Sequence, residues 1–364
     1  MTDLSLSQLT IGRLAIPESL DAPDAGPFLD FIRIANAACR HDAGHSDLDY
    51  EPHEALVSWH DQVDWGHVGF LAERDGVVLG GAELSYQKEE DAESAEFELW
   101  IDPDHWGEGA EEALLAAIEA EALAIGRRTI QIFTFHRPAD GGRPLVPSTG
   151  WGSIPADDRQ TVFHLDNGFT LEQVERTSAF DLQGSFDVVE RMLQDALEKA
   201  GPDYRPVVWT SPTPEQYREG LAYAISRMAT DAPQGGLVVD EQKWDADRVR
   251  RRDERLQAQR YTVSVACVEH VPTGRIAAYN EIAIQSDHTA ATLQWGTLVL
   301  KEHRGRSLGT IVKCANLLRW RELVPESPRV TTFNAEENRH MLDINEAIGF
   351  TPVSYAGAWK KVLD

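Results

Sequence analysis

The chain has 364 residues, more than one hydrophobic core usually serves, so its length predicts two domains. Hydrophobic residues make up 42% and charged residues 26%, which excludes a disordered chain. Asp and Glu number 60 against 34 Lys and Arg, and the net charge of −26 disfavours nucleic acid and anionic membranes as partners. This charge either serves solubility or attracts a cationic substrate such as an amine, and composition does not decide between the two.

The three cysteines, Cys39, Cys267 and Cys314, stand far apart in unrelated contexts. Their spacing predicts neither a disulfide framework nor a metal site. The first residues lack a basic region followed by an apolar run, and no apolar stretch reaches membrane-spanning length. We therefore expect a cytoplasmic protein with no metal, signal peptide or membrane segment.

The first half alternates between strand and helix patterns. Residues 68–72 and 77–84 flank an Asp-Gly turn, which is typical of a hairpin. Alternating apolar residues predict a further strand over 95–101, and Ala, Leu and Glu at helical spacing predict a helix over 109–125. Another predicted strand, 128–134, follows that helix.

The same order of elements returns in the second half, which implies a duplicated α/β domain. Its predicted strands are 261–269, 275–285, 291–300 and 329–333, and its predicted helices are 308–323 and 338–348.

The boundary between the two copies is expected near residue 185. An amphipathic pattern over 186–200 is broken by Gly201-Pro202, and the sequence Ser-Pro-Thr-Pro-Glu at 211–215 opens a new helix. The predicted organisation is a first domain over 1–185, a connector helix within 186–203 and a second domain over 204–364.

A turn rich in glycine and arginine joins the strand that ends near residue 300 to the helix that begins at 308. The first N–H groups of such a helix have no internal partners, and the helix dipole adds partial positive charge there. An anion such as a pyrophosphate fits this place, and Gly305 and Gly309 would allow its close approach. The alternative is an ordinary strand-to-helix turn with a solvated basic patch.

Two motifs give this half a resemblance to the GNAT acetyltransferase superfamily. The acyl-CoA motif of the superfamily is Arg/Gln-x-x-Gly-x-Gly/Ala, and the segment 304–309 matches it at both ends, with Ser307 in place of the middle glycine. Downstream, 334–338 and Gly349-Phe350 are similar to the superfamily's closing strand, Asn-led helix and Gly-Phe. The resemblance implies an α/β (α+β) fold of two tandem GNAT-like domains, each a mixed, mostly antiparallel sheet flanked by helices. Mycothiol synthase is similar in its tandem arrangement with one active half.

The resemblance also implies acetyl-CoA as co-substrate and assigns residues to its parts. The backbone of Thr297, Leu298 and Val299 would bond the pantetheine arm, and an N–H near Val299 would polarise the thioester carbonyl. Asn334 and Asn338 would contact the pantetheine or the far end of the coenzyme. The residues implied for the pyrophosphate are Arg304, Gly305, Arg306, Ser307, Leu308, Gly309 and Thr310.

Three residues are candidates for proton transfer. Many members of the superfamily carry a general-acid Tyr seven residues after the helix-leading Asn, where this chain has Asn345, whose amide cannot supply a proton. Tyr355 is an alternative donor. Glu281, which shares a strand face with Tyr279, is either the base that deprotonates an ammonium or a solvent-facing or salt-bridged carboxylate.

The first half holds a counterpart of the motif within residues 101–112. There Trp106 replaces the arginine and Glu111 stands where the last small residue belongs, with Glu108 and Glu112 close by. Carboxylates at this place repel a pyrophosphate more strongly than a helix dipole attracts it. We therefore expect the first domain to keep the fold without the coenzyme, and to cover the cleft or shape the substrate pocket of the second.

The sequence thus predicts an N-acetyltransferase in whose second domain the amine of a small molecule attacks the thioester of acetyl-CoA directly. Two alternatives stay open, namely a non-catalytic module that binds an acyl-CoA or a metabolite, and a peptide or protein N-acetyltransferase. The acceptor, the acyl-chain preference and the choice between a monomer and a homodimer are not predicted.

Overall fold

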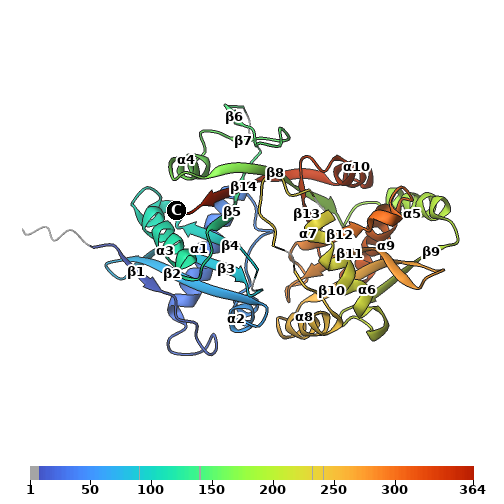
Figure 1. The fold of residues 1–364 in the computed structure, drawn as a ribbon, viewed down its shortest axis with the longest axis horizontal. Helices are drawn as coiled ribbons and strands as arrows, with labels where there is room; N and C mark the ends of the chain where they lie inside the picture. Colours follow the sequence, from blue (N-terminus) through green and yellow to red (C-terminus); the bar gives the residue numbers. More distant parts are fainter. Residues whose placement is uncertain (1–7, 90, 139–140, 232, 241) are drawn as a thin grey trace, which may run out of the picture. The chain divides into compact units, whose positions relative to one another are not determined.

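The structure, a computed structural model, describes residues 8–89, 91–138, 141–231, 233–240 and 242–364 (Figure 1). The chain forms two compact units. Unit 1 comprises residues 1–174, 236–240 and 355–364, and unit 2 comprises residues 175–235 and 241–354. No helix within the described residues is both long and apolar enough to cross a membrane.

The sheet of unit 1 has the strand order β1-β2-β3-β4-β5-β14, and its neighbours pair antiparallel except β4 and β5, which are parallel. Its strands are β1 (Thr10–Arg13), β2 (Trp65–Arg74), β3 (Val77–Gln87), β4 (Ser94–Ile101), β5 (Thr129–His136) and β14 (Thr351–Val362). The helical segments are α1 (Gly26–Ala43), α2 (Pro52–His60), η1 (Pro103–His105), α3 (Ala110–Ala124) and α4 (Arg159–Asp166). The short strands β6 (Pro144–Leu145) and β7 (Ile154–Pro155) form a separate pair.

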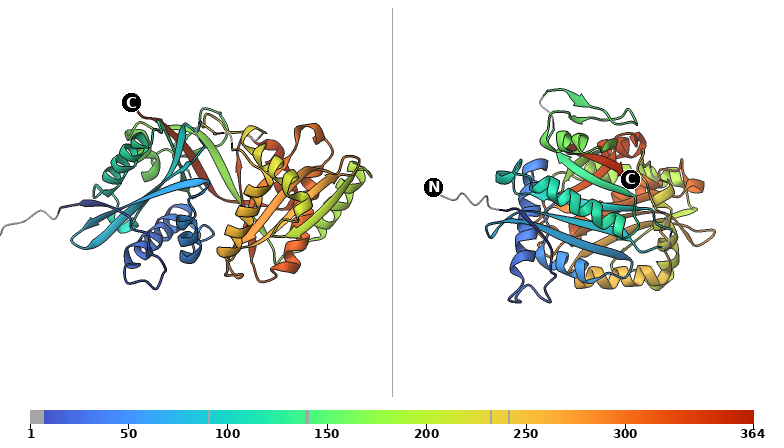
Figure 2. Two further views of the ribbon diagram at one scale, coloured as in Figure 1. Left: turned by 60° about the horizontal axis from the view of Figure 1, so that its bottom comes forward. Right: turned by 60° about the vertical axis from the view of Figure 1, so that its left-hand side comes forward.

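Successive residues of these strands face two different helical layers, as the period of a strand requires. In β2, Leu71 packs in the cluster that contains Phe31 of α1, whereas Ala72 packs in the cluster that contains Leu114 of α3. Figure 2 shows α1 and α3 on opposite sides of the strands of unit 1. Unit 1 therefore has a core on each face of its sheet.

The sheet of unit 2 has the strand order β8-β13-β12-β11-β10-β9, in which only β12 and β13 are parallel. Its strands are β8 (Thr170–Asp181), β9 (Tyr204–Thr210), β10 (Thr262–His270), β11 (Arg275–Ile284), β12 (Thr292–Val299) and β13 (Arg329–Ala335). The helical segments are α5 (Asp187–Ala200), α6 (Glu215–Ser226), α7 (Met228–Asp231), α8 (Ala246–Ala258), η2 (Lys301–His303), α9 (Leu308–Leu323) and α10 (Arg339–Ile348).

The two faces of this sheet are again covered by different helices. Val265 of β10 packs in the cluster that contains Leu221 of α6, and its neighbour Ala266 packs in the cluster that contains Ile311 of α9. The expected fold is thereby confirmed: each unit is a mixed, mostly antiparallel sheet flanked by helices. The expected helix over 308–323 is α9.

The units divide the chain differently from the boundary expected near residue 185. Residues 175–181 of β8 belong to unit 2, because they pair with β13 from Ala335 to Arg329. The segment expected as a connector lies within unit 2 as α5, whose Ala196 and Ala200 are buried against α9. Residues 355–362 of β14 belong to unit 1, because they pair with β5. A local pattern predicts a strand but not the sheet that the strand joins.

Candidate functional site

Strands β12 and β13 of unit 2 pair along only a short stretch. Their register covers Thr292–Gln294 of β12 against Val330–Thr332 of β13, although β12 continues to Val299 and β13 to Ala335. Beyond this stretch the two strands no longer pair. One edge of β12 is then open over residues 295–299, next to the loop that carries the motif.

The open edge presents backbone groups of β12. Leu300 N–H donates to Ala277 O of β11 at 3.0 Å, and the groups of successive residues alternate between the two edges of a strand. Thr297 and Val299 therefore turn their N–H and C=O groups to the open edge. The carbonyl of Val299 accepts a hydrogen bond from Arg304 Nε at 3.2 Å, which agrees with this direction. The open edge of β12 thus offers backbone donors and acceptors of Thr297 and Val299.

The loop after β12 turns its backbone into the start of α9. Gly305 has φ +81° and Ser307 has φ +58°, so both lie in the left-handed region, where a non-glycine residue costs about 1 kcal/mol. The first N–H groups of α9, from Leu308 onward, have no carbonyl partner within the helix. Ser307 makes no capping hydrogen bond with its side chain, so these donors stay available to an anion.

Gly309 needs a different explanation from Gly305. It lies within α9, where an added Cβ would meet Ile344 Cδ1 and Val299 Cγ2 at 3.5 Å, which is ordinary contact. The fold therefore tolerates alanine at this position. A larger side chain would enter the cavity, which Gly309 lines at the start of α9.

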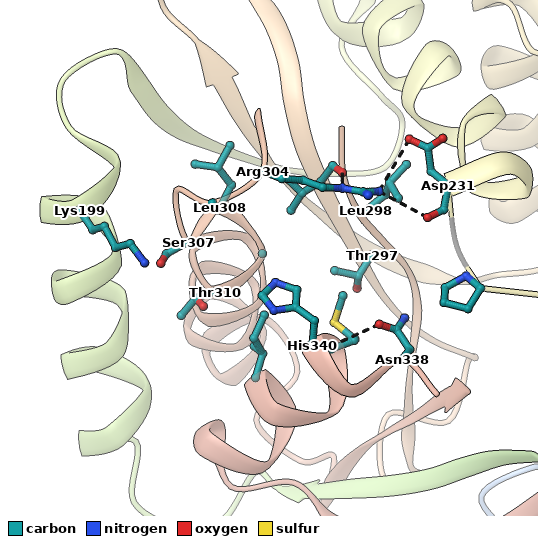
Figure 3. Close-up of a pocket in the computed structure, with 16 residues that line it drawn as sticks. Lys199, Asp231, Thr297, Leu298, Arg304, Ser307, Leu308, Thr310, Asn338 and His340 are labelled. Carbon is teal, nitrogen blue, oxygen red and sulfur yellow. Dashed lines mark hydrogen bonds and ion pairs between the residues drawn. The ribbon is translucent and has the colours of Figure 1, made fainter. Parts of the chain in front are cut away.

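A cavity of about 630 Å³ opens between the edge of β12, the loop and α10 (Figure 3). Ten of the residues predicted to bind the coenzyme line it, namely Thr297, Leu298, Val299, Arg304, Gly305, Ser307, Leu308, Gly309, Thr310 and Asn338. The sequence analysis missed six others, Lys199, Asp231, Pro233, His340, Met341 and Ile344.

Asp231 of α7 faces Arg304 across the cavity (Figure 3). Its carboxylate pairs with Arg227 at 2.8 Å, with Lys301 at 3.2 Å and with Arg304 at 3.8 Å. Burial by itself would raise the pKa of Asp231, but the hydrogen bonds from Lys301 and Arg227 outweigh it and hold that pKa below its ordinary value. A phosphate at the loop would therefore compete with a carboxylate for Arg304.

Two predicted coenzyme residues do not line the cavity. The guanidinium of Arg306 lies over the ring of Tyr204, 5.4 Å from its centroid. The side-chain carbonyl of Asn334 accepts a hydrogen bond from Asn345 Nδ2 at 2.6 Å. Asn338, by contrast, begins α10 as expected, and its side chain accepts from the N–H of Met341 at 3.4 Å.

The candidate base Glu281 is buried and held by an arginine. Arg252 donates to its two carboxylate oxygens at 2.7 and 3.0 Å, and 3% of Glu281 is exposed. The register of β11 with β12 shifts between Asn280 and Ile282, so Glu281 sits at an irregularity of the strand. Of the two alternatives for Glu281, the salt-bridged one describes the structure, and Glu281 does not line the cavity.

The two acid candidates also lie outside the lining of the cavity. Asn345 is buried in α10 and bonded to Asn334. Tyr355 belongs to unit 1, where it is paired with His136 of β5 and packs against the core of that unit. The sequence offered Tyr355 as an alternative donor, but position in the sequence does not report the unit that a residue joins.

One carboxyl group of unit 2 that was not predicted from the sequence has a raised pKa. Glu175 of β8 lies opposite Ala335 of β13, on the strand face of Phe333. Burial, and then the nearby carboxylate of Glu337, raise the pKa of Glu175 to about 7. No local signal marks Glu175, because its neighbours come from a pairing between segments far apart in the sequence.

In the corresponding loop of unit 1, the side chain of Glu111 binds a backbone N–H group of the loop. Gly107 and Gly109 have φ +85° and +88°, and α3 begins at Ala110, so the backbone follows that of the loop in unit 2. Glu111, 2% exposed, accepts the N–H of Gly107 at 2.6 Å. A carboxylate therefore takes an amide that a phosphate would use. Its counterpart by position in unit 2 is Gly309, since both are the second residue of the helix.

Residues 30–139 match the model of the acetyltransferase (GNAT) family. The chain contains a GNAT acetyltransferase domain. No protein with curated functional information matches the sequence significantly. Solved structures extend the likeness from this domain to the whole chain.

The tandem GNAT protein from the clavulanic acid biosynthesis pathway superposes with a TM-score of 0.74 at 20% identity, over 98% of each chain. A GCN5-related N-acetyltransferase from Sphaerobacter thermophilus gives 0.60 at 13% identity, over 97% of this chain and 95% of its own. A glucosamine N-acetyltransferase region of a fungal multi-domain β-N-acetylglucosaminidase gives 0.62 at 13% identity, and there the likeness covers 98% of this chain and 38% of the other. The fold of the chain is that of a tandem GNAT protein.

The family match and the cavity fall in different halves of the chain. The matched residues lie in unit 1, whose loop holds Glu111, whereas the acyl-CoA motif and the cavity lie in unit 2. The family match therefore does not identify the half with an active site. The two loops differ in this respect, because a carboxylate occupies the loop of unit 1 and a cavity adjoins the loop of unit 2.

Proposed function

We propose that this protein is an N-acetyltransferase that uses acetyl-CoA as co-substrate and acetylates the amine of a small molecule in unit 2. The observation that carries the proposal is the cavity of about 630 Å³ between the open edge of β12 and the start of α9. Such a volume is in the range of small-molecule and cofactor sites. GNAT acetyltransferases, the family matched by residues 30–139, generally catalyse this class of reaction.

The residues of unit 2 fit the coenzyme in two respects. The loop offers helix-start N–H groups behind residues with positive φ, which suits a pyrophosphate. The edge of β12 offers the backbone of Thr297 and Val299, which suits the amides of a pantetheine arm. Bound acetyl-CoA supplies an activated acyl group, and the N–H of Val299 is placed to stabilise charge on its carbonyl oxygen.

In the proposed reaction the amine nitrogen bonds to the carbonyl carbon, the carbon–sulfur bond breaks and the thiolate leaves. The ammonium proton has to be removed before attack, and Glu281 is the base proposed from the sequence. Because Glu281 does not line the cavity, water would carry the proton from the ammonium to its carboxylate, which is paired with Arg252. Asn345 cannot supply a proton and, like Tyr355, does not line the cavity, so water is the proposed source of the proton for the thiolate.

The loop of unit 1 suggests a substitution that tests the proposal. Gly309→Glu places in unit 2 the carboxylate that Glu111 places in unit 1, where it would take the N–H of Gly305 and repel a phosphate. We expect the wild type to bind one equivalent of coenzyme A in calorimetry and Gly309→Glu to lose at least about 100-fold in affinity. Gly309→Ala is the matched control and should bind within a fewfold of the wild type, because its Cβ makes only ordinary contacts.

Activity is measured as thiol release from acetyl-CoA with a panel of amines that includes glucosamine, other amino sugars and basic peptides. Release with small amines, lost in Gly309→Glu, supports the proposal. Binding without thiol release for any amine contradicts it and favours a non-catalytic coenzyme-binding module. Release with peptides alone contradicts the small-molecule acceptor.

A further inference from the structure

Helix α5, which was expected to be a connector, carries a lysine that lines the cavity. Ala196 and Ala200 of α5 are buried in the cluster that contains Leu308 and Ile311 of α9, so α5 lies along the helix whose start faces the cavity. Lys199, between the two alanines in sequence, lines the cavity. In Figure 3 its ammonium group points toward Ser307, at the start of α9.

The other cations of the loop are already engaged. Lys301 and Arg304 both pair with Asp231, and Arg306 lies over the ring of Tyr204. Within the described ranges, the side chain of Lys199 takes part in no hydrogen bond or ion pair. It therefore brings an uncompensated positive charge to the cavity of a chain whose net charge is −26.

We propose that Lys199 is a coenzyme-binding residue whose ammonium group holds the pyrophosphate of coenzyme A at the start of α9. This inference rests on the proposed function. The helix start offers partial charges equivalent to about half an elementary charge, whereas the acidic surface repels a polyanion over a longer range. A full positive charge within reach of Ser307 offsets that repulsion at the place where the phosphates would lie. Lys199 is on a different helix from the loop, so the site takes its phosphate contacts from two segments.

The test is calorimetry of coenzyme A binding to Lys199→Met, a substitution that keeps the length of the side chain and suits a helix. We expect affinity to fall by about five- to tenfold at low ionic strength, and the difference to shrink as salt is added. Arg191→Met is the matched control, because Arg191 is an exposed cation of α5 that does not line the cavity. It should bind as the wild type does, and Lys199→Arg should keep most of the affinity.

Titration with dephospho-coenzyme A, which lacks the 3′-phosphate, identifies the phosphate. If Lys199 holds the pyrophosphate, Lys199→Met loses the same factor with this ligand. A loss that vanishes with dephospho-coenzyme A overturns the inference, because the 3′-phosphate is then the partner. Equal affinities of Lys199→Met and Arg191→Met overturn it as well. A wild type that binds no coenzyme A contradicts the proposed function itself, which separates the two failures.

Discussion

Lys313 of α9 is fully buried, and its ammonium group has no hydrogen-bond partner within the described chain. The ammonium lies 5.6 Å from the centre of the Phe350 ring, an aromatic face and not a counter-ion. Burial lowers the pKa of Lys313 from 10.5 to about 7. Between these two values the unfolded chain binds more protons than the folded one, so this residue makes the free energy of unfolding rise with pH across that window. At pH 7 and below, its cost to stability is largest.

Replacing this lysine by methionine should therefore stabilise unit 2. We expect Lys313→Met to raise the free energy of unfolding by about 1–3 kcal/mol at neutral pH, with a smaller gain toward pH 10. Urea denaturation at several pH values measures the effect, with Lys243→Met as the control because Lys243 is exposed. A variant that is less stable than the wild type at pH 7 would show that Lys313 has a partner in solution.

At the scale of single residues, the sequence could predict those parts of the site that are contiguous. The loop from Arg304 to Thr310 is one local motif, and all of it except Arg306 lines the cavity. Lys199 and Asp231 were missed, because each comes from a segment more than 70 residues before the loop and carries no signal of its own. Glu281 was recognised as a carboxylate in a strand, but its pairing with Arg252 depends on how α8 packs on β11.

The segments η1–α3 and η2–α9 have the same backbone conformation but differ in the side chain at the start of the long helix. In each, a short helix leads into a residue with positive φ, Gly109 or Ser307, and then into a long helix. The second residue of that helix is Glu111 in unit 1 and Gly309 in unit 2. A carboxylate thus closes the start of α3, whereas the start of α9 is open. The local sequence already indicates this difference.

The carboxylate at the start of α3 leads to a prediction about the stability of unit 1. Glu111→Ala should lower the stability of unit 1 by about 1–2 kcal/mol, because the N–H of Gly107 loses a charge-assisted hydrogen bond to a buried carboxylate. Glu112→Ala removes an exposed carboxylate from the same first turn and is the matched control for the helix-dipole contribution. Hydrogen exchange of peptides from α3 measures both. Neither change should alter the affinity for coenzyme A, and a gain of affinity or a second bound equivalent in Glu111→Ala would place a coenzyme site in unit 1.

Predictability also varied among whole elements. Strands with alternating apolar residues were predicted, because their periodicity is strong. Helix α8 was not predicted. Its sequence from 246 to 258 is mostly charged, and only Val249 and Leu256 among its buried residues are apolar. Such a helix is specified by the surface that it covers more than by its own pattern.

For the molecule as a whole, the duplication was visible in the order of elements, but the assignment of strands to sheets was not. Strands β8 and β14 each contribute residues to both units. Pairing between distant segments decides this, and no local property of a strand reports its partner. The last residues of the chain consequently stabilise the unit that contains its first residues.

This organisation predicts which unit weakens when the end of the chain is altered. Trp359 of β14 is fully buried in the core of unit 1, and its indole N–H donates to Thr134 Oγ1 at 2.8 Å. Trp359→Ala should cost unit 1 about 3–5 kcal/mol, whereas Val362→Ala, at a position 65% exposed in the same strand, should cost less than about 0.5 kcal/mol. Hydrogen exchange followed by mass spectrometry resolves the two units, and we expect faster exchange in peptides from β2 to β5 with unchanged protection in β10 to β12. Equal loss of protection in both sets would mean that the units unfold together, and loss confined to β10–β12 would mean that Trp359 supports the other unit.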